Sequence, residues 1–563
     1  MGMAQEKRQP EPEAEAPRAA PKPSIPPSRR RGLSRSLPRV TLGILAAFGA
    51  LLLIVIVASF FIDEPLRRRI EKGMNRSLKG YTIELPRAHV QLLGLSVTLH
   101  DLTVRQQAHP EPPVAVIPRL HASVQWKELI RLHLVADFLF DHPKLYVNLP
   151  QLRQEIADPT PVKDRGWQQA LERVYPLKIN LLRVADGEVT YVDVDSTQPL
   201  RITRVFARAN NIRNIHSREY VYPSPIQVEA TIFDRGRLDL NGHADFFAEP
   251  SPGFHFLFRA GGVPLERVRG VAARTNIAVR GGVLETSGEV EYSARSKTTH
   301  LKDLKITDMR LDYLHTSATA PVEAKRKADV SQAAKKVANK PGVLLKVDRL
   351  ELARCEIGFV NKAKEPTYRV FWAPVHLVVT NLSNHFEQGA AEAHFEGKFM
   401  GAGRTEAVAR FRPEKNGPDF DLKASIEDTP LTTMNDLLRA YGKFDVTAGV
   451  FSFYSELHVQ NGQVTGYVKP LFRDVKVYDA RQDAEKGLFR KLYEKLVGGV
   501  ADLLENRHTQ RVATEAKIEG PVGGKKTSTL QVIARLIENA FFRAILPGFD
   551  EILSGKVART HRP

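Results

Sequence analysis

Apolar and polar residues alternate with a period of two through much of this 563-residue chain. The alternation is plain in Leu95–Leu99, Leu145–Leu149, Phe254–Phe258 and Val290–Tyr292. Successive side chains of a strand point to opposite faces of a sheet, so this pattern predicts antiparallel strands with one apolar and one wetted face. Asp186-Gly187, Asn241-Gly242 and Asn461-Gly462 favour tight turns between such strands.

Helical patterns are short before residue 480. A basic helix is expected from Pro65 to about Leu78, and others in Trp126–Leu132, Trp167–Val174 and Pro430–Tyr441. These helices are too few to cover several hundred residues of one-sided sheet. The sheet therefore either closes on itself, as a sandwich or barrel, or curls into a trough whose apolar lining meets a hydrophobic ligand.

The first sixty residues predict a membrane anchor. Residues 1–39 hold eight prolines and nine Lys or Arg, which is typical of a disordered tail. Val40–Ile62 follows without a charge, and a helix of this length, about 34 Å, crosses a hydrocarbon core of about 30 Å. No good cleavage site follows, so an uncut anchor is favoured over a signal peptide. Basic residues flank the span almost equally on both sides, which leaves its orientation open.

An internal duplication is indicated by residues 177–193 and 345–361, which align without gaps at an offset of 168 with six identities. Pro264-Leu265 and Pro430-Leu431 continue the match at 166, which favours a stacked, repeated β architecture. The expected organisation is a tail (1–39), a transmembrane helix (40–62), an N-terminal β unit with short helices (63–175), a first repeat (176–319), a basic linker or insert (320–340), a second repeat (341–478) and a helical C-terminal region with a short strand (479–563).

The basic segment at 320–340 and the C-terminal segment each have a simple structural interpretation. Residues 320–340 hold six Lys or Arg and no large aliphatic residue beyond three valines, so an exposed loop or solvated helix is expected. A nucleic-acid patch is the alternative, but no aromatic residues are interleaved to stack bases. Two amphipathic helices are expected near the C-terminus, at about 488–505 and 529–545. Core packing against the sheet is their simplest role, and contact with a membrane surface or a partner is the alternative.

Catalytic and metal-binding patterns are weak. The single cysteine, Cys355, excludes a disulfide framework and a CxxC redox site. Gly520–Thr527 lacks the spacing of a phosphate loop, and the histidines lack the spacing of metal ligands. We expect no enzyme activity, no metal, no cofactor and no nucleic-acid partner. The net charge of +18 does not choose among anionic partners.

The alternating apolar residues are the candidate lining of a lipid groove. A 16-carbon acyl chain has about 15 groups to bury at about 0.8 kcal/mol each, or about 12 kcal/mol, so a sheltered path is energetically valuable. The candidate lining residues are Leu95, Val97, Leu99, Leu145, Val147, Phe254, Phe256, Phe258, Val290 and Tyr292.

The chain resembles the AsmA-like proteins of the Gram-negative envelope. The likeness lies in the order of the anchor, Glu64–Tyr81 and Leu95–Val104, and in Tyr441–Pro470 and Asn539–Phe549, which are similar to an uncharacterised branch of the family. The resemblance implies an inner-membrane protein with a cytoplasmic N-terminus and its bulk in the periplasm. It also implies a distant likeness to bridge-like lipid-transfer proteins, and it supplies no catalytic residues.

The expected function is therefore non-enzymatic binding or conduction of phospholipid acyl chains in a β-groove, as part of envelope lipid transport and outer-membrane homeostasis. The alternative is a periplasmic scaffold or assembly factor for envelope proteins, with a closed sheet and no lipid path. Other envelope proteins or a second copy of the chain are further partners to consider.

Overall fold

The computed structural model describes residues 62–91, 94–124, 135–157, 178–192, 199–212, 222–246, 248, 252–337, 339–385, 389–411, 419–442, 445–461, 463–478 and 516–521. The tail, nearly all of the expected anchor, the expected helices at 126–132 and 167–174, and both expected C-terminal helices lie outside these residues. No helix within the described ranges combines the length and the apolar character that membrane crossing requires.

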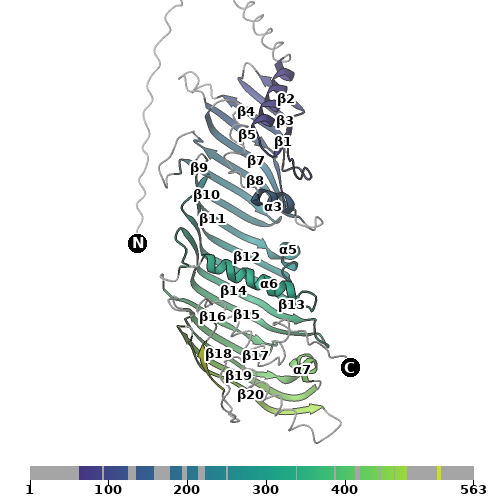
Figure 1. Ribbon diagram of the computed structural model, residues 1–563, viewed down its shortest axis with the longest axis vertical. Coiled ribbons are helices and arrows are strands. Elements are labelled where there is room, and N and C mark those ends of the chain that lie inside the picture. Colours follow the sequence, from purple (N-terminus) through teal and green to yellow (C-terminus); the bar gives the residue numbers. More distant parts are fainter. Residues whose placement is uncertain are drawn as a thin grey trace, which may run out of the picture. The chain divides into compact units, whose positions relative to one another are not determined.

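Strands dominate the described part of the chain, as expected, and they join one sheet (Figure 1). The first six strands are β1 (Tyr81–Glu84), β2 (Arg87–Gln91), β3 (Ser96–Gln106), β4 (Ala115–Val124), β5 (Val135–Asp141) and β6 (Lys144–Asn148). The next seven are β7 (Lys178–Val192), β8 (Leu200–Asn210), β9 (Ser224–Ile232), β10 (Gly236–Asp245), β11 (Gly253–Pro264), β12 (Ile277–Tyr292) and β13 (Lys297–His315). The last eight are β14 (Val343–Asn361), β15 (Tyr368–Ser383), β16 (Ala391–Phe399), β17 (Gly403–Phe411), β18 (Phe420–Pro430), β19 (Asp445–Gln460), β20 (Gln463–Tyr478) and β21 (Ala516–Pro521).

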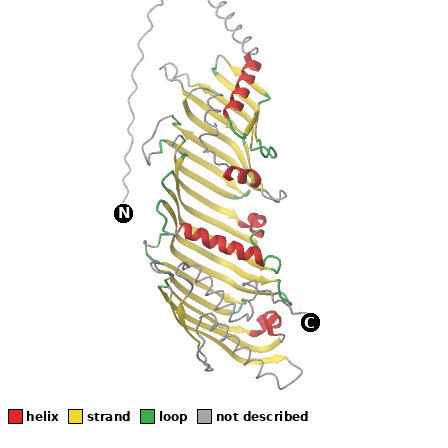
Figure 2. Ribbon diagram, in the orientation of Figure 1, coloured by secondary structure: helices red, strands yellow, loops and turns green. Residues whose placement is uncertain are grey.

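Helices are few and short among the described residues (Figure 2). Residues 62–77 are helical, which confirms the helix expected from Pro65. The others are α3 (Leu149–Ala157), η2 (Leu265–Val268), α5 (Arg269–Ala273), α6 (Ala320–Val337), η4 (Leu431–Met434) and α7 (Asn435–Gly442). η4 and α7 confirm the helix expected at 430–441, and α6 shows that the basic insert is a helix.

Most neighbouring strands are antiparallel, but the prediction of an antiparallel sheet is wrong at two junctions. β7 pairs parallel to β5 and β6, and β14 pairs parallel to β13. Parallel neighbours need a long crossover in place of a hairpin. α3 lies in the connection that precedes β7, and α6 lies in the connection that precedes β14. Period-two alternation is the same for both kinds of pairing, which is why the sequence pattern did not distinguish them.

The order of elements repeats. Five strands, a short helical turn and two further strands run from β7 to β13, and the same series runs from β14 to β20. Pro264 and Pro430 each end the fifth strand and precede η2 and η4, at the offset of 166 seen in the sequence. The aligned residues thus occupy equivalent places in the sheet.

Irregular positions recur inside the long strands and interrupt their register. Asp186, Asp308, Arg354 and Asp428 all have φ between 50° and 55° within strands, and the pairing shifts beside several of them. Such bulges bend a strand and increase its twist. The expected turn at Asp186-Gly187 is wrong because these residues form a bulge within β7: Asp-Gly supplies a positive φ to a bulge as readily as to a turn.

Of the other two expected turns, one is wrong and one is confirmed. Asn241-Gly242 lies inside β10, where both residues pair with β9 and β11, so this expectation is wrong. A Cβ at Gly242 would lie 2.0 Å from the carbonyl oxygen of His255, so glycine here permits close approach of β11. Asn461 does lie in the turn between β19 and β20, with a φ of 51°.

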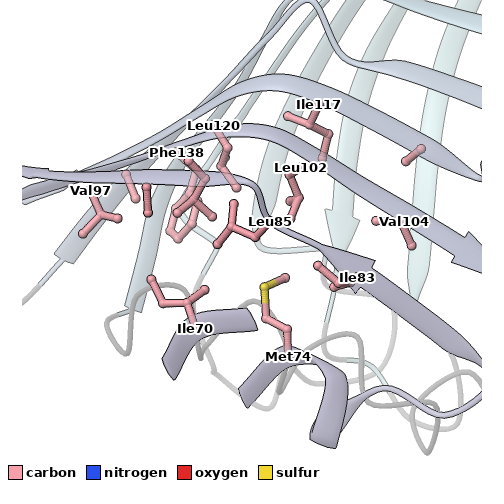
Figure 3. Packing of buried hydrophobic residues seen from close by; sticks show 14 of the residues in the cluster. Ile70, Met74, Ile83, Leu85, Val97, Leu102, Val104, Ile117, Leu120 and Phe138 are labelled. Carbon is pink, nitrogen blue, oxygen red and sulfur yellow. The ribbon is translucent and has the colours of Figure 1, made fainter. Parts of the chain in front are cut away.

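Two closed cores lie at opposite ends of the strand series. At the N-terminal end, Ile70 and Met74 of the helix at 62–77 pack on β1 to β5 (Figure 3). At the C-terminal end, η4 and α7 pack on β15 to β20. Full burial of a large aliphatic or aromatic side chain stabilises the fold by about 1.5–3 kcal/mol, so each core is a substantial source of stability.

Candidate functional site

One face of the sheet carries an almost unbroken apolar row from β9 to β20. Each residue of the row is the register partner of the next, and Thr286 is its one polar member. In strand order the row is Ala230, Leu238, Ala260, Thr286, Leu304, Leu350, Val379, Ala393, Ala409, Leu422, Leu457 and Gly466. Strands lie about 4.8 Å apart, so the row extends for about 50 Å.

The adjacent row, one residue along each strand, is entirely polar. In the same order it reads Glu229, Asp239, Arg259, Ser287, Asp303, Arg349, Thr380, Glu392, Arg410, Asp421, His458 and Thr465. Neighbouring positions on a strand face opposite sides. The sheet therefore has one apolar and one charged face, as the alternation predicts.

Burial along the apolar face is uneven. Between residues 139 and 367, no described Leu, Phe, Tyr or Trp is buried; the buried apolar residues there are alanines and a few others such as Val263 and Met309. At the two ends, by contrast, Leu99 and Phe420 are 0% exposed. The large side chains of the middle strands are therefore only partly covered.

The helical turns explain this difference between the two repeats. In the second repeat, Leu431 and Met434 of η4 are buried, as are Leu437 and Leu438 of α7. The equivalent positions in η2 and α5, 166 residues earlier, are Leu265, Val268, Val271 and Ala272, and none is buried. α5 is shorter than α7 and has smaller side chains at these positions. The first repeat therefore lacks the buried helix that closes the core of the second.

Five of the ten residues predicted from the sequence meet on β11 and β12 of this face. Phe254 pairs with Tyr292, Phe256 with Val290, and Phe258 with Gly288. The ring of Phe254 lies 5.2 Å from that of Phe256 and stacks on Tyr292 at 5.7 Å. All five predicted side chains are half-buried. They form a continuous apolar surface on β11 and β12.

The other five predicted residues lie outside β11 and β12. Val97 and Leu99 belong to the closed N-terminal core beneath the helix at 62–77, so they cannot meet a guest in this structure. Leu95 lies in the turn before β3 with a φ of 43°. Leu145 and Val147 are on β6 and pair with Val189 and Tyr191 of β7, so the register places them on the same apolar face, where Leu145 is 44% exposed. Alternation alone does not separate a core strand from a lining strand, because the covering helix is remote in sequence.

Sequence reasoning also missed residues that continue the face. Leu304, Leu350 and Val379 carry it across both copies, at the parallel junction of β13 and β14 and beyond. Leu304-Lys-Ile306 and Leu350-Glu-Leu352 show the same alternation, so the signal was present. The alternation did not predict that Leu304 and Leu350 would be register partners across two parallel strands.

The charged face is held together by ion pairs across strands. His300 lies between Glu289, at 3.1 Å, and Asp348, at 2.7 Å. The hydrogen bond from His300 lowers the pKa of Glu289, although burial opposes this. A hollow of about 500 Å³ on this face is lined by both signs of charge, including Arg259, Asp303 and Glu351. Such mutual neutralisation gives the hollow no preference for an anion or a cation.

No group of three or more His, Cys, Asp or Glu side chains is placed to hold a metal ion in the part of the chain that the structure describes. Cys355, the one cysteine, packs with Met309 and Val375 on the apolar face and is 1% exposed.

We expect Cys355 to react slowly with maleimide or a disulfide reagent in the folded protein. Burial raises the pKa of its thiol, so the reactive thiolate is scarce as well as covered. Labelling at pH 8 should be at least about a hundredfold faster in denaturant than in buffer. Rapid labelling of the folded chain would mean that β14 and β15 separate readily at this position.

No protein-family model, no curated protein and no solved structure matches the chain at a significant level.

Proposed function

We propose that this protein binds phospholipid acyl chains along the apolar face of β7 to β14 and acts without catalysis. In this proposal it is anchored in the inner membrane by residues 40–62, with its bulk in the periplasm, and contributes to envelope lipid transport. The observation that carries the proposal is the apolar row whose large side chains are only partly covered between residues 139 and 367.

The energetics favour an apolar guest over water. An exposed Leu or Phe gains about 1.5–3 kcal/mol when it is fully covered, and an acyl chain gains about 0.8 kcal/mol for each methylene group buried. Along the apolar face, the partly covered side chains and the methylene groups of an acyl chain can contact each other over a continuous length. On the charged face, contacts such as those of His300 with Glu289 and Asp348 join neighbouring strands.

Two sequence features support the membrane setting. The uncharged segment Val40–Ile62 is long enough to span a bilayer, and the resemblance to AsmA-like proteins favours a cytoplasmic N-terminus. We propose both, together with membership of that family.

The alternative function is a scaffold that binds other envelope proteins. The closed cores at both ends favour it, because there the sheet is filled by the protein's own side chains. A scaffold needs no guest in the middle strands.

Lipid analysis separates the two. We expect the full chain, purified in a mild detergent and extracted, to release phospholipid detectable by mass spectrometry at about one or more molecules per chain. A chain that carries no lipid, and takes up none when it is offered, would refute the lipid-binding proposal and favour the scaffold.

A further inference from the structure

α6 returns the chain from the end of β13 to the start of β14, on the same side of the sheet as α7 (Figure 2). Beneath α7 that side presents the apolar core residues of the second repeat. At the start of α6, Glu323 pairs with His315, whose ring stacks on Phe359, a residue packed against the same core. α6 therefore crosses the apolar face.

Polar contacts hold α6 at both ends. Near its N-terminus, Glu323 accepts a hydrogen bond from Asn276 at 2.9 Å, besides its contact with His315 at 2.9 Å. At the other end, Asn384 donates to the carbonyl oxygen of Val337 at 2.7 Å. Arg326 of α6 also donates a hydrogen bond to the carbonyl oxygen of Arg274, at 2.8 Å. None of these contacts uses a lysine, so the lysines are not needed to attach α6.

α6 is a cationic helix above an apolar surface. Its sequence contains five Lys or Arg and two acidic residues, Glu323 and Asp329. Glu323 is engaged at the anchor. Lys325 and Lys336 are exposed, and neither forms an ion pair among the described residues. The charged row of the sheet faces the opposite side, so it does not neutralise them.

We propose that α6 selects lipids with an anionic phosphate headgroup, which its lysines bind while the acyl chains lie on the apolar face of β11 to β14. This inference rests on the proposed function and narrows its substrate class. Charge complementarity supplies the argument: a lysine near a lipid phosphate contributes on the order of 1 kcal/mol, and several act together. A neutral lipid with the same chains gains only the apolar contribution.

The test compares two lipids that differ only in the phosphate. Dioleoyl phosphatidic acid and dioleoylglycerol are offered separately, in detergent micelles, to the full-length protein, and the bound lipid is counted by mass spectrometry. We expect the protein to load phosphatidic acid at least about tenfold better at moderate ionic strength.

The decisive variant replaces Lys325, Lys327, Lys335 and Lys336 by Gln, which has a similar helix propensity. It should lose most of the preference for phosphatidic acid and load dioleoylglycerol as before. The matched control replaces four basic residues on the charged face of the sheet by Gln: Arg183, Arg208, Arg237 and Lys423. Each of them is next to a residue of the apolar face on its own strand, so it lies on the side opposite to that face. It should keep the preference, although it loses the same net charge.

The outcomes separate the inference from the proposed function. Equal loading of both lipids by the unmodified protein would refute headgroup selection and leave acyl-chain binding intact, whereas loading of neither would refute the proposed function. An equal loss in both Gln variants would attribute the preference to the overall charge of +18, against the inference. Displacement of phosphatidic acid by inorganic phosphate alone would show a free-anion site, which also overturns it.

Discussion

Aspartate in place of Phe256 or Val290 should reduce lipid loading at least about tenfold. The two residues are register partners on β11 and β12, in the part of the apolar face that no buried Leu or aromatic side chain fills. An ionised carboxylate next to an acyl chain would lose water without gaining a partner, which costs several kcal/mol. The measurement is bound phospholipid per folded chain, by mass spectrometry after purification in the same detergent.

The adjacent residue supplies the control. Leu257 is 50% exposed and lies between Phe256 and Phe258 on the opposite, charged side. Leu257→Asp adds the same charge one residue away and should leave lipid loading within about twofold, because its carboxylate stays in water. If Phe256→Asp folds normally and carries as much lipid as the unmodified protein, the face is not the lipid path.

The second large effect is a difference in stability between two equivalent phenylalanines. Phe254 of β11 and Phe420 of β18 occupy the same place in the two repeats, 166 residues apart. Phe420 is 0% exposed within the closed core, whereas Phe254 is half-buried. Phe420→Ala should lower the free energy of unfolding by about 3–5 kcal/mol through lost burial and a cavity. Phe254→Ala should cost roughly half of that or less in lipid-free protein, because less surface is lost and no closed cavity forms.

Chemical denaturation of lipid-free protein, followed by circular dichroism, measures both changes. Saturating lipid should stabilise the unmodified protein more than Phe254→Ala, since that variant offers the guest less apolar area. Equal and large losses for the two variants would mean that the first repeat is as tightly filled as the second, and the open face would be refuted.

The sequence predicted the local features that depend on neighbouring residues. Alternation predicted the two faces of the sheet, and the helix after Pro65 and the one after Pro430 were both expected from their local patterns. The match of Pro264 with Pro430 anticipated the repeated order of elements. These features are encoded within a few residues, so a single sequence suffices to predict them.

Features that depend on remote partners were not predictable. Leu99 and Phe256 have the same alternating surroundings, yet a helix about thirty residues away covers Leu99, whereas no helix among the described residues packs over Phe256. Asp186-Gly187 fits a turn or a bulge equally well, and only the pairing with β8 decides between them. The parallel step from β13 to β14 likewise depends on how α6 directs the chain.

That parallel step gives the architecture a property of its own. Among the described residues, β7 to β13 and β14 to β20 each comprise seven strands, an odd number, so the last strand of a copy points in the same direction as its first. A parallel junction starts the next copy in that same direction, and its short helices return to the same edge. A third copy inserted there would lengthen the sheet by about 34 Å, at about 4.8 Å per strand, without reversing its polarity. Tandem duplication can thus adjust the reach of such a protein in steps of fixed size while leaving both termini unchanged.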